Sequence, residues 1–239
     1  MTRSPDPDLP LYRISLDHRQ VKLPDAFALP FDVAAHEEAA FARHGIPCPA
    51  SIARSVRKRQ AEFLAGRLAA RAALAACGAP DAELAIGPTR QPVWPQGYLG
   101  SISHTSNLAV AVALPASRLR GVGIDLEHVV SPATLHALHA TVVDDDERKR
   151  LAQAALVHGW PVVLTAVFSA KESFFKASFA TVGRLFDFHA VRVLRFDADN
   201  GEIEVEVVEQ LAEPFMPATT WTLRCQRLNP QTLLTHMAW

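Results

Sequence analysis

Two acidic residues at the end of an apolar run are spaced so that both can serve one chemical task. The segment 121–128 reads GVGIDLEH, and Asp125 and Glu127 are two residues apart in it. In an extended strand, side chains two residues apart project from the same face. Neighbouring carboxylates repel each other unless a cation lies between them, and a hard divalent ion such as Mg2+ takes oxygen ligands. The alternative is a polar strand face in water, which this pair alone leaves open.

A second pair, Glu172 and Lys176, is four residues apart in the run VFSAKESFFKASF. On a helix this spacing places both side chains on one face, where they could act together or form only an exposed ion pair. Ser169 and Glu172 could instead form a capping box, S-x-x-E, at a helix start. The apolar residues before Ser169 indicate that the helix has already begun there, so we expect Ser169 in its interior.

A basic helix is the third candidate. Residues 52–77 are rich in Ala, Leu and Arg and are followed by Gly78 and Pro80, which predicts a helix that ends there. It contains one acidic residue, Glu62, and six basic residues: Arg54, Arg57, Lys58, Arg59, Arg67 and Arg71. Its net charge is therefore +5, and the rest of the chain sums to −6. The guanidinium fork suits phosphate oxygens, although a solvated helix face explains the charges equally well.

Two smaller features accompany this helix. Gly66 lies in its interior, where glycine costs about 1 kcal/mol relative to Ala and indicates that another group approaches closely. His104 lies in the run GSISHTSN immediately before an apolar strand. It could offer a hydrogen bond or partial charge to a phosphate, and the alternative is a purely structural histidine.

The helices and strands that must position these residues can be predicted from the sequence. They indicate an α+β chain of two halves, 1–118 and 119–239, each a small antiparallel sheet with helices. The apolar runs 108–114 and 122–126 are predicted to form a hairpin, and Asp199-Asn200-Gly201 a hairpin turn. The segment 78–100 is too interrupted by proline for a long helix. Strands are predicted at Leu11–Leu16, Phe27–Val33, Leu108–Leu114, Val122–Leu126, Ala190–Phe196, Glu202–Val208, Thr220–Leu228 and Thr232–Trp239, and helices at Ile52–Cys77, Pro132–Ala140, Asp144–His158 and Trp160–Phe179.

Composition excludes several classes of protein. The chain has 239 residues, 49% of them apolar, and a net charge of −1, which argues against disorder and against a protein that wraps duplex DNA. Three cysteines at wide spacing suggest neither a disulfide framework nor a zinc site. No signal peptide or membrane span is evident, so we expect a cytoplasmic protein without nucleic-acid or membrane partners.

Taken together and in this order, four segments resemble the 4′-phosphopantetheinyl transferases of the monomeric type that serve siderophore and surfactin synthesis. The resemblance covers about residues 55–180, and Phe168 stands where the family often has Trp. The segments are RKRQAEFLAGRLAARAAL (57–74), PVWPQGYLGSISH (92–104), GVGIDLE (121–127) and FSAKESFFKA (168–177).

The resemblance implies a fold of two similar halves with the active site in the cleft between them. It implies transfer of the phosphopantetheine arm of coenzyme A to a serine of an apo acyl or peptidyl carrier protein, with Mg2+ as cofactor and release of adenosine 3′,5′-bisphosphate. Glu172 and Lys176 would be catalytic, and a monomer is expected. Carried over by position, Asp125, Glu127 and Glu172 would bind Mg2+, and Arg59, Arg67, Arg90, Ser103 and His104 would hold coenzyme A.

Two other functions remain open. A Mg2+-dependent phosphohydrolase or nucleotidyl transferase could use the same D-x-E strand and E-x-x-x-K helix. A non-catalytic coenzyme A binding module would need only the basic helix, but such a degenerate copy would be expected to have lost at least one acidic residue or the lysine.

Overall fold

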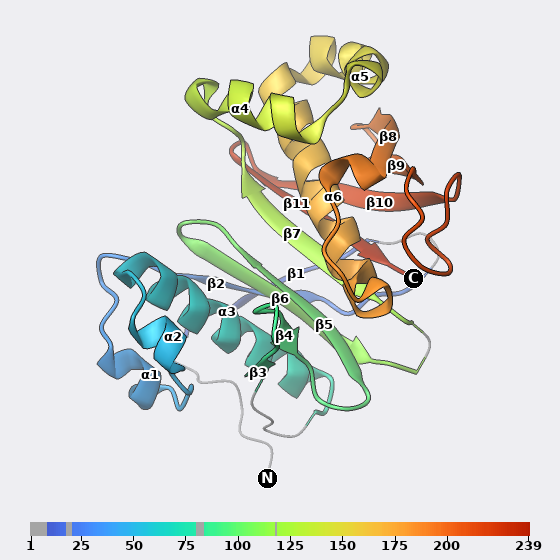
Figure 1. Cartoon of the computed structure of the whole chain (residues 1–239). Coiled ribbons are helices and arrows are strands. Elements are labelled where there is room, and N and C mark those ends of the chain that lie inside the picture. The colour runs from blue at the N-terminus through green and yellow to red at the C-terminus, as the bar shows by residue number, and fades with distance from the viewer. Residues whose placement is uncertain (1–8, 18–20, 80–83, 118) are drawn as a thin grey trace. The chain divides into compact units, whose positions relative to one another are not determined.

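The computed structural model describes residues 9–17, 21–79, 84–117 and 119–239 (Figure 1). The chain divides into two compact units between Arg120 and Gly121. Each unit contains an antiparallel sheet and helices, which confirms the predicted α+β class. Among the described residues, no helix has the length and apolar content needed to cross a membrane.

The first unit is a four-stranded sheet with a long helix packed on it. The strand order is β1-β2-β6-β5, and helix α3 contacts β2, β6 and β5. Strands β3 and β4 pair separately. The bounds are β1 Tyr12–Ile14, β2 Ala26–Pro30, α1 Ala39–Arg43, α2 Ala50–Ala53, α3 Arg57–Ala76, β3 Ala85–Ile86, β4 Pro92–Val93, β5 Tyr98–His104 and β6 Leu108–Pro115.

The predicted helix over 52–77 is wrong at its start, because the chain breaks into α2 and α3. Val56 is extended, with φ −63° and ψ 152°, and α3 begins at Arg57. The side chain of Gln60 donates to the carbonyls of Ala53 and Ser55, both at 3.0 Å. These bonds satisfy carbonyls at the end of α2 that would otherwise lack partners. Arg54 therefore lies outside the basic helix.

The predicted hairpin of residues 108–114 and 122–126 is also wrong. Strand β6 pairs with β2 and β5 in the first unit, whereas β7 pairs with β11 in the second. Two apolar runs joined by a short polar turn are typical of a hairpin, but here the turn is the connection between units. Strand β6 thus lies between β2 and β5, and Ser103 and His104 belong to β5.

The second unit is a five-stranded sheet whose strand order is β7-β11-β10-β9-β8. Figure 1 shows helix α6 lying along this sheet, and its contacts are with β7, β11 and β10. The bounds are β7 Val122–His128, α4 Pro132–Val142, α5 Asp145–His158, α6 Trp160–Val182, the 3-10 helix Phe188–Ala190, β8 Val191–Asp197, β9 Glu202–Val207, β10 Thr220–Asn229 and β11 Thr232–Ala238.

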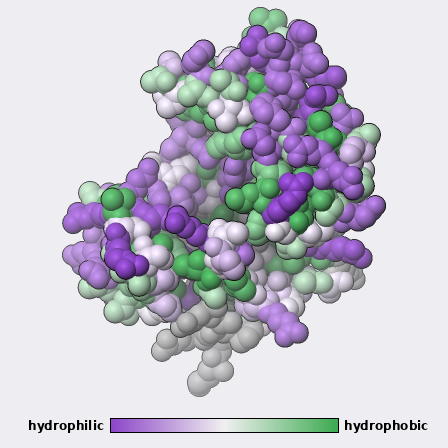
Figure 2. Space-filling view, in the orientation of Figure 1, coloured by the Kyte–Doolittle hydropathy of each residue, from purple (hydrophilic) through white to green (hydrophobic). Residues whose placement is uncertain are grey.

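A buried ion pair anchors α6 to the start of α5. Lys171 Nζ lies 2.8 Å from Glu147 Oε1, and both side chains are 1% exposed. Glu147 also accepts from the backbone N–H of Val193, and with Asp144 it forms the capping box of α5. Removing one partner of such a pair leaves an uncompensated buried charge, which typically costs 3–5 kcal/mol. Charged side chains are exposed along the first half of α5, where Figure 2 shows mostly hydrophilic atoms, whereas Leu156 and Val157 near its end are exposed apolar residues.

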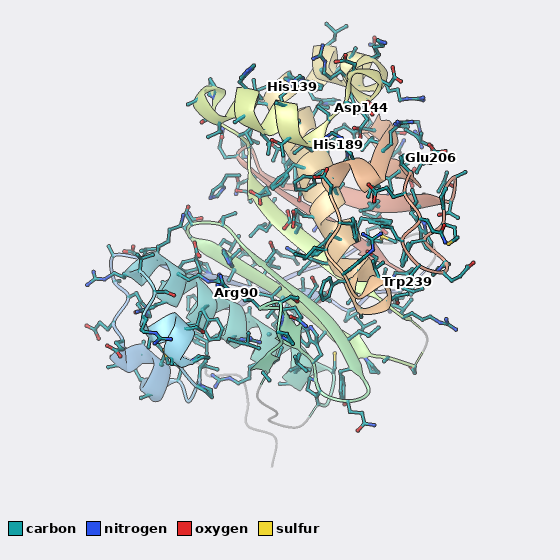
Figure 3. All side chains as sticks on the ribbon, in the orientation of Figure 1. Arg90, His139, Asp144, His189, Glu206 and Trp239 are labelled. Carbon is teal, nitrogen blue, oxygen red and sulfur yellow. The ribbon has the colours of Figure 1, made fainter. Side chains whose placement is uncertain are left out.

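Two glycines allow α6 to lie directly on β7. A Cβ atom at Gly121 would meet Ala177 O at 2.0 Å, and one at Gly123 would meet Ser173 O at 2.0 Å. Trp239 Nε1 donates to Ala177 O at 2.9 Å, so the same turn of α6 is held by an indole, and Figure 3 shows Trp239 near the end of that helix. The pattern G-x-G before Asp125 is therefore a packing requirement of the helix above it.

We expect Gly123→Ala to destabilise the second unit, because the new methyl group meets the backbone of α6 and neither β7 nor α6 can move without disturbing the sheet. Overpacking of this kind costs about 1–3 kcal/mol, to be measured by chemical denaturation. The comparison variant is Gly66→Ala, whose methyl group would meet only the side chain of Ile102 at 3.0 Å. Equal losses of stability in the two variants would contradict this account of Gly123.

Candidate active site

A lysine and an aspartate join α6 to β7 in the second unit. Lys176 Nζ donates to Asp125 Oδ1 at 2.6 Å and to the carbonyl of Ile124 at 3.1 Å. The Asp125 side chain is 4% exposed and that of Lys176 is 25% exposed. The lysine ammonium therefore neutralises a nearly buried carboxylate while part of it stays open to solvent.

Glu127 and Glu172 share the electrostatic environment of this pair. Burial, followed by the negative charge of Asp125 and a smaller effect of Glu172, raises the pKa of Glu127 to about 8, although Lys176 opposes the shift. The pKa of Glu172 is also raised. Burial is the largest cause, the charge of Lys176 opposes the shift, and the charge of Asp125 adds to it. Burial and the nearby charge of Asp125 thus both disfavour the charged forms of Glu127 and Glu172. A cation bound among these carboxylates would stabilise their charged forms.

Asp125, Glu127 and Glu172 offer the oxygen ligands that a divalent metal requires. Carboxylate oxygens suit Mg2+, which usually takes one or two carboxylates and completes its octahedron with water and substrate phosphates. Among the described residues, no three His, Cys, Asp or Glu side chains converge into a preformed metal cluster. The chemistry of the three carboxylates therefore fits Mg2+ with part of its shell from substrate, and does not fit a cage made by protein alone.

A pocket of about 230 Å3 opens beside Glu172 within the second unit. Its walls come from the C-terminal half of α6 and from the segment that leads into β8, and most of them are apolar. The lining residues are Lys171, Glu172, Phe175, Leu185, Phe186, Asp187, Phe188 and Val191. Glu172 is thus part of the wall of this pocket.

In the first unit, Arg59 and His104 meet across α3 and β5. Arg59 Nη1 lies 3.2 Å from His104 Nε2, and Glu62 Oε2 lies 3.8 Å from Arg59 and 3.9 Å from His104. A guanidinium has only donors, so the bond requires a neutral imidazole that accepts at Nε2. The structure brings these two predicted residues together, and Gly66 lies against β5 as its position predicts, since a Cβ there would meet Ile102 at 3.0 Å.

Arg67 lies two turns further along α3 and is 7% exposed. One of its terminal nitrogens, Nη2, donates to Ala85 O at 3.4 Å, and the guanidinium stacks over Phe63 at 4.9 Å. The other, Nη1, is buried and has no hydrogen-bond partner among the described residues. Burial and the nearby charge of Arg59 lower the pKa of Arg67 to about 10. An anion bound beside Nη1 would accept its hydrogen bond and would stabilise the charged form of the buried guanidinium.

The other two predicted coenzyme A residues are placed differently. Arg90 lies in the turn between β3 and β4 with a φ of 68°, and its side chain is labelled in Figure 3. Within the described part of the first unit, no hydrogen bond or ion pair joins Arg90 to Arg59 or Arg67. Ser103 is 6% exposed and lies next to His104 in β5, where it pairs with Val110 of β6.

Sequence reasoning missed several residues that lie around Asp125 and Glu172. The hydroxyls of Ser169, Ser173 and Thr235 meet beneath Asp125, and Lys171 is buried next to Glu172. The one available signal was a threonine within the apolar run TLLTHMA near the C-terminus. It could not indicate that β11 lies beside β7, because that pairing joins residues more than 100 positions apart.

Two family models match this chain. Residues 49–114 match the 4′-phosphopantetheinyl transferase N-terminal domain, and residues 121–226 match the 4′-phosphopantetheinyl transferase superfamily. The two matches fall on the basic helix with β5 and β6, and on β7 with α6. The chain belongs to the 4′-phosphopantetheinyl transferase superfamily.

Several characterised relatives share much of the sequence. Enterobactin synthase component D of Salmonella typhimurium is 40% identical over 173 residues, which are 72% of this chain and 70% of that protein. Its Salmonella typhi counterpart is 48% identical over 121 residues, 51% of this chain and 49% of the relative. The 4′-phosphopantetheinyl transferase PptT of Mycobacterium tuberculosis is 35% identical over 150 residues, 62% of this chain and 63% of PptT. The matched segments thus span from about half to 70% of these relatives.

Glu127 predicts a pH dependence of stability in the absence of divalent cations. Its folded-state pKa of about 8 exceeds the ordinary value of 4.5, so the folded protein holds this proton more tightly than the unfolded chain does. The stabilising contribution is complete below about pH 4.5 and is lost as the pH rises through about 8. In thermal melts between these pH values, the melting temperature should fall less steeply with pH in Glu127→Gln than in the wild-type protein. The exposed control Glu209→Gln should follow the wild-type profile. An unchanged profile in Glu127→Gln would refute the assigned shift.

Proposed function

We propose that this protein transfers the 4′-phosphopantetheine arm of coenzyme A to a serine of an apo acyl or peptidyl carrier protein, with Mg2+, and releases adenosine 3′,5′-bisphosphate. The observation that carries the proposal is the group formed by Asp125, Glu127, Glu172 and Lys176 on β7 and α6. It joins carboxylates suited to a divalent ion to a lysine, beside a pocket, in a chain of this superfamily.

We assign coenzyme A binding to residues of the first unit and metal binding and catalysis to residues of the second. Arg59, Arg67 and His104 of the first unit hold coenzyme A phosphates, with Ser103 and Arg90 as further contacts. Support comes from the buried Nη1 of Arg67, because a phosphate oxygen is the acceptor that a desolvated guanidinium favours. The imidazole of His104, which lies beside Arg59, would offer a hydrogen bond to the same phosphates.

In the second unit, Asp125, Glu127 and Glu172 would hold Mg2+, which supplies Lewis-acid polarisation and orientation of the diphosphate. Glu172 accepts the proton of the carrier serine hydroxyl, directly or through one water molecule, and its raised pKa suits a general base. The serine oxygen forms a bond to the β-phosphorus while the bond from that phosphorus to the bridging oxygen breaks. Lys176 neutralises the charge that develops on the leaving phosphate.

Partners and pathway follow from the same proposal. The protein partner is an acyl carrier or peptidyl carrier protein, and the active form is a monomer in the cytoplasm. Two relatives that carry the name enterobactin synthase component D favour a role in siderophore or other nonribosomal peptide synthesis over fatty acid synthesis. A holo-[acyl-carrier-protein] synthase activity is included in the proposal.

The test is a chromatographic assay for adenosine 3′,5′-bisphosphate released from coenzyme A. We expect release only when Mg2+ and an apo carrier protein are both present, and none with a carrier whose serine is replaced by Ala. Release without any carrier would identify a phosphohydrolase instead. Binding of coenzyme A with no release under any condition would identify a non-catalytic binding module.

Replacing the two catalytic residues should separate their roles. Glu172→Ala should abolish transfer while the protein stays folded, because both the general base and a metal ligand are lost. Lys176→Ala should lower kcat by about 10²-fold or more with a smaller effect on the KM for coenzyme A, since the lysine acts on developing charge. The matched controls are Glu209→Ala and Lys149→Ala, both exposed. Normal turnover by either site variant removes its proposed role.

Replacing the phosphate ligands should affect binding instead. Arg59→Ala and Arg67→Met should each raise the apparent KM for coenzyme A by about tenfold, the loss of one charged hydrogen bond. Met retains an unbranched apolar stem that can still pack on Phe63, and Arg43→Ala is the exposed control in the same unit. With dephospho-coenzyme A, an arginine that contacts the missing 3′-phosphate should show no effect. An unchanged KM for coenzyme A in Arg67→Met would contradict its assignment.

A further inference from the structure

Three hydroxyl groups form a buried network between α6 and β11. Ser169 Oγ and Ser173 Oγ each lie 2.8 Å from Thr235 Oγ1, and all three residues are 0% exposed. Ser169 also donates to the carbonyl of Asp125 at 3.3 Å, and Ser173 to the carbonyl of Thr235 at 3.0 Å. A hydrophobic interface would have served packing equally well, so the polar groups call for an explanation.

The network lies at the level of the carboxylate that Lys176 binds. Thr235 is the cross-strand partner of Asp125 in the pairing of β7 with β11. Ser169 and Ser173 are four residues apart and so share one face of α6, while Lys176 is three residues beyond Ser173. Helix α6 thus contacts this one position of the sheet at three points: the Asp125 carbonyl, the Thr235 hydroxyl and the Asp125 carboxylate.

The three hydroxyl protons are enough for one continuous chain of hydrogen bonds. In this arrangement Ser173 donates to the hydroxyl of Thr235 in place of the Thr235 carbonyl, Thr235 donates to Ser169, and Ser169 donates to the carbonyl of Asp125. Each proton is used once, and each hydroxyl in the middle both accepts and donates, so the bonds polarise one another. Directional bonds of this kind fix the rotation and height of a helix, which apolar contacts do not do alone.

We propose that Ser169, Ser173 and Thr235 are positioning residues that set the rotation and height of α6 over β7, so that Glu172 and Lys176 face Asp125. The inference rests on the proposed function, because it assigns these hydroxyls an effect on the transfer step. They touch neither substrate nor metal and act only through the residues that do. A small rotation of α6 moves Lys176 away from the reacting phosphate, and a misplacement of 1 Å can cost 10²-fold in rate.

The test compares Thr235→Val with Thr235→Ser in steady-state transfer assays. Valine has nearly the same shape but no hydroxyl, and we expect kcat to fall by about 10- to 100-fold. The KM for coenzyme A should stay within twofold, because the proposed phosphate ligands lie on α3 and β5. Serine retains the hydroxyl and should restore most of kcat. A split between kcat and KM, with rescue by serine, is not expected of a purely structural residue.

A matched variant separates positioning from stability. Ile203→Val removes one methylene from the same buried core, on β9, which does not carry the site. Thermal melts of Thr235→Val and Ile203→Val are compared with their rates, and Ile203→Val should keep the wild-type kcat. Wild-type kcat in Thr235→Val, or an equal loss of kcat in both variants, would overturn the inference. Absence of transfer by the wild-type protein would overturn the proposed function instead.

Discussion

The second unit is organised around the near-contact between β7 and the middle of α6. Gly121 and Gly123 remove the side chains that would otherwise collide with the helix backbone at Ala177 and Ser173. Only at that separation can Lys176 reach both the Asp125 carboxylate and the Ile124 carbonyl. The hydroxyls of Ser169, Ser173 and Thr235 fill the same interface with directional bonds. The candidate active site thus depends on backbone packing first and on charged side chains second.

The charges of the site carry an energetic cost that a substrate complex would relieve. Burial and the charge of Asp125 raise the pKa of Glu127 and of Glu172, and Lys176 offsets only part of these effects. In the first unit, the desolvated guanidinium of Arg67 has a buried nitrogen with no partner in the described residues. In the proposed function, a phosphate would supply the missing partner of Arg67, and a divalent ion would supply positive charge among the carboxylates. Binding and catalytic sites commonly lower the stability of the free protein.

The sequence was sufficient to predict local features and insufficient for distant ones. The helix that carries Glu172 and Lys176 and the strand that carries Asp125 follow from periodicity within a few residues. The pairing of β6 with β5, rather than with β7, does not, because an apolar run carries no record of its partner. The role of Thr235 could not be predicted for the same reason, since its neighbours Asp125 and Ser169 lie far away in the sequence. The break between α2 and α3 includes bonds from the Gln60 side chain to the carbonyls of Ala53 and Ser55, which helix propensity does not describe.

The central claim is that the basic helix of the first unit and the carboxylate group of the second serve one group transfer. Mass spectrometry of an apo carrier protein, incubated with this protein, coenzyme A and Mg2+, tests it most directly. The account predicts that the carrier gains the mass of one phosphopantetheinyl group, located on its conserved serine by peptide mapping. A carrier of unchanged mass, with fully folded enzyme and several acyl and peptidyl carriers tried, would contradict it.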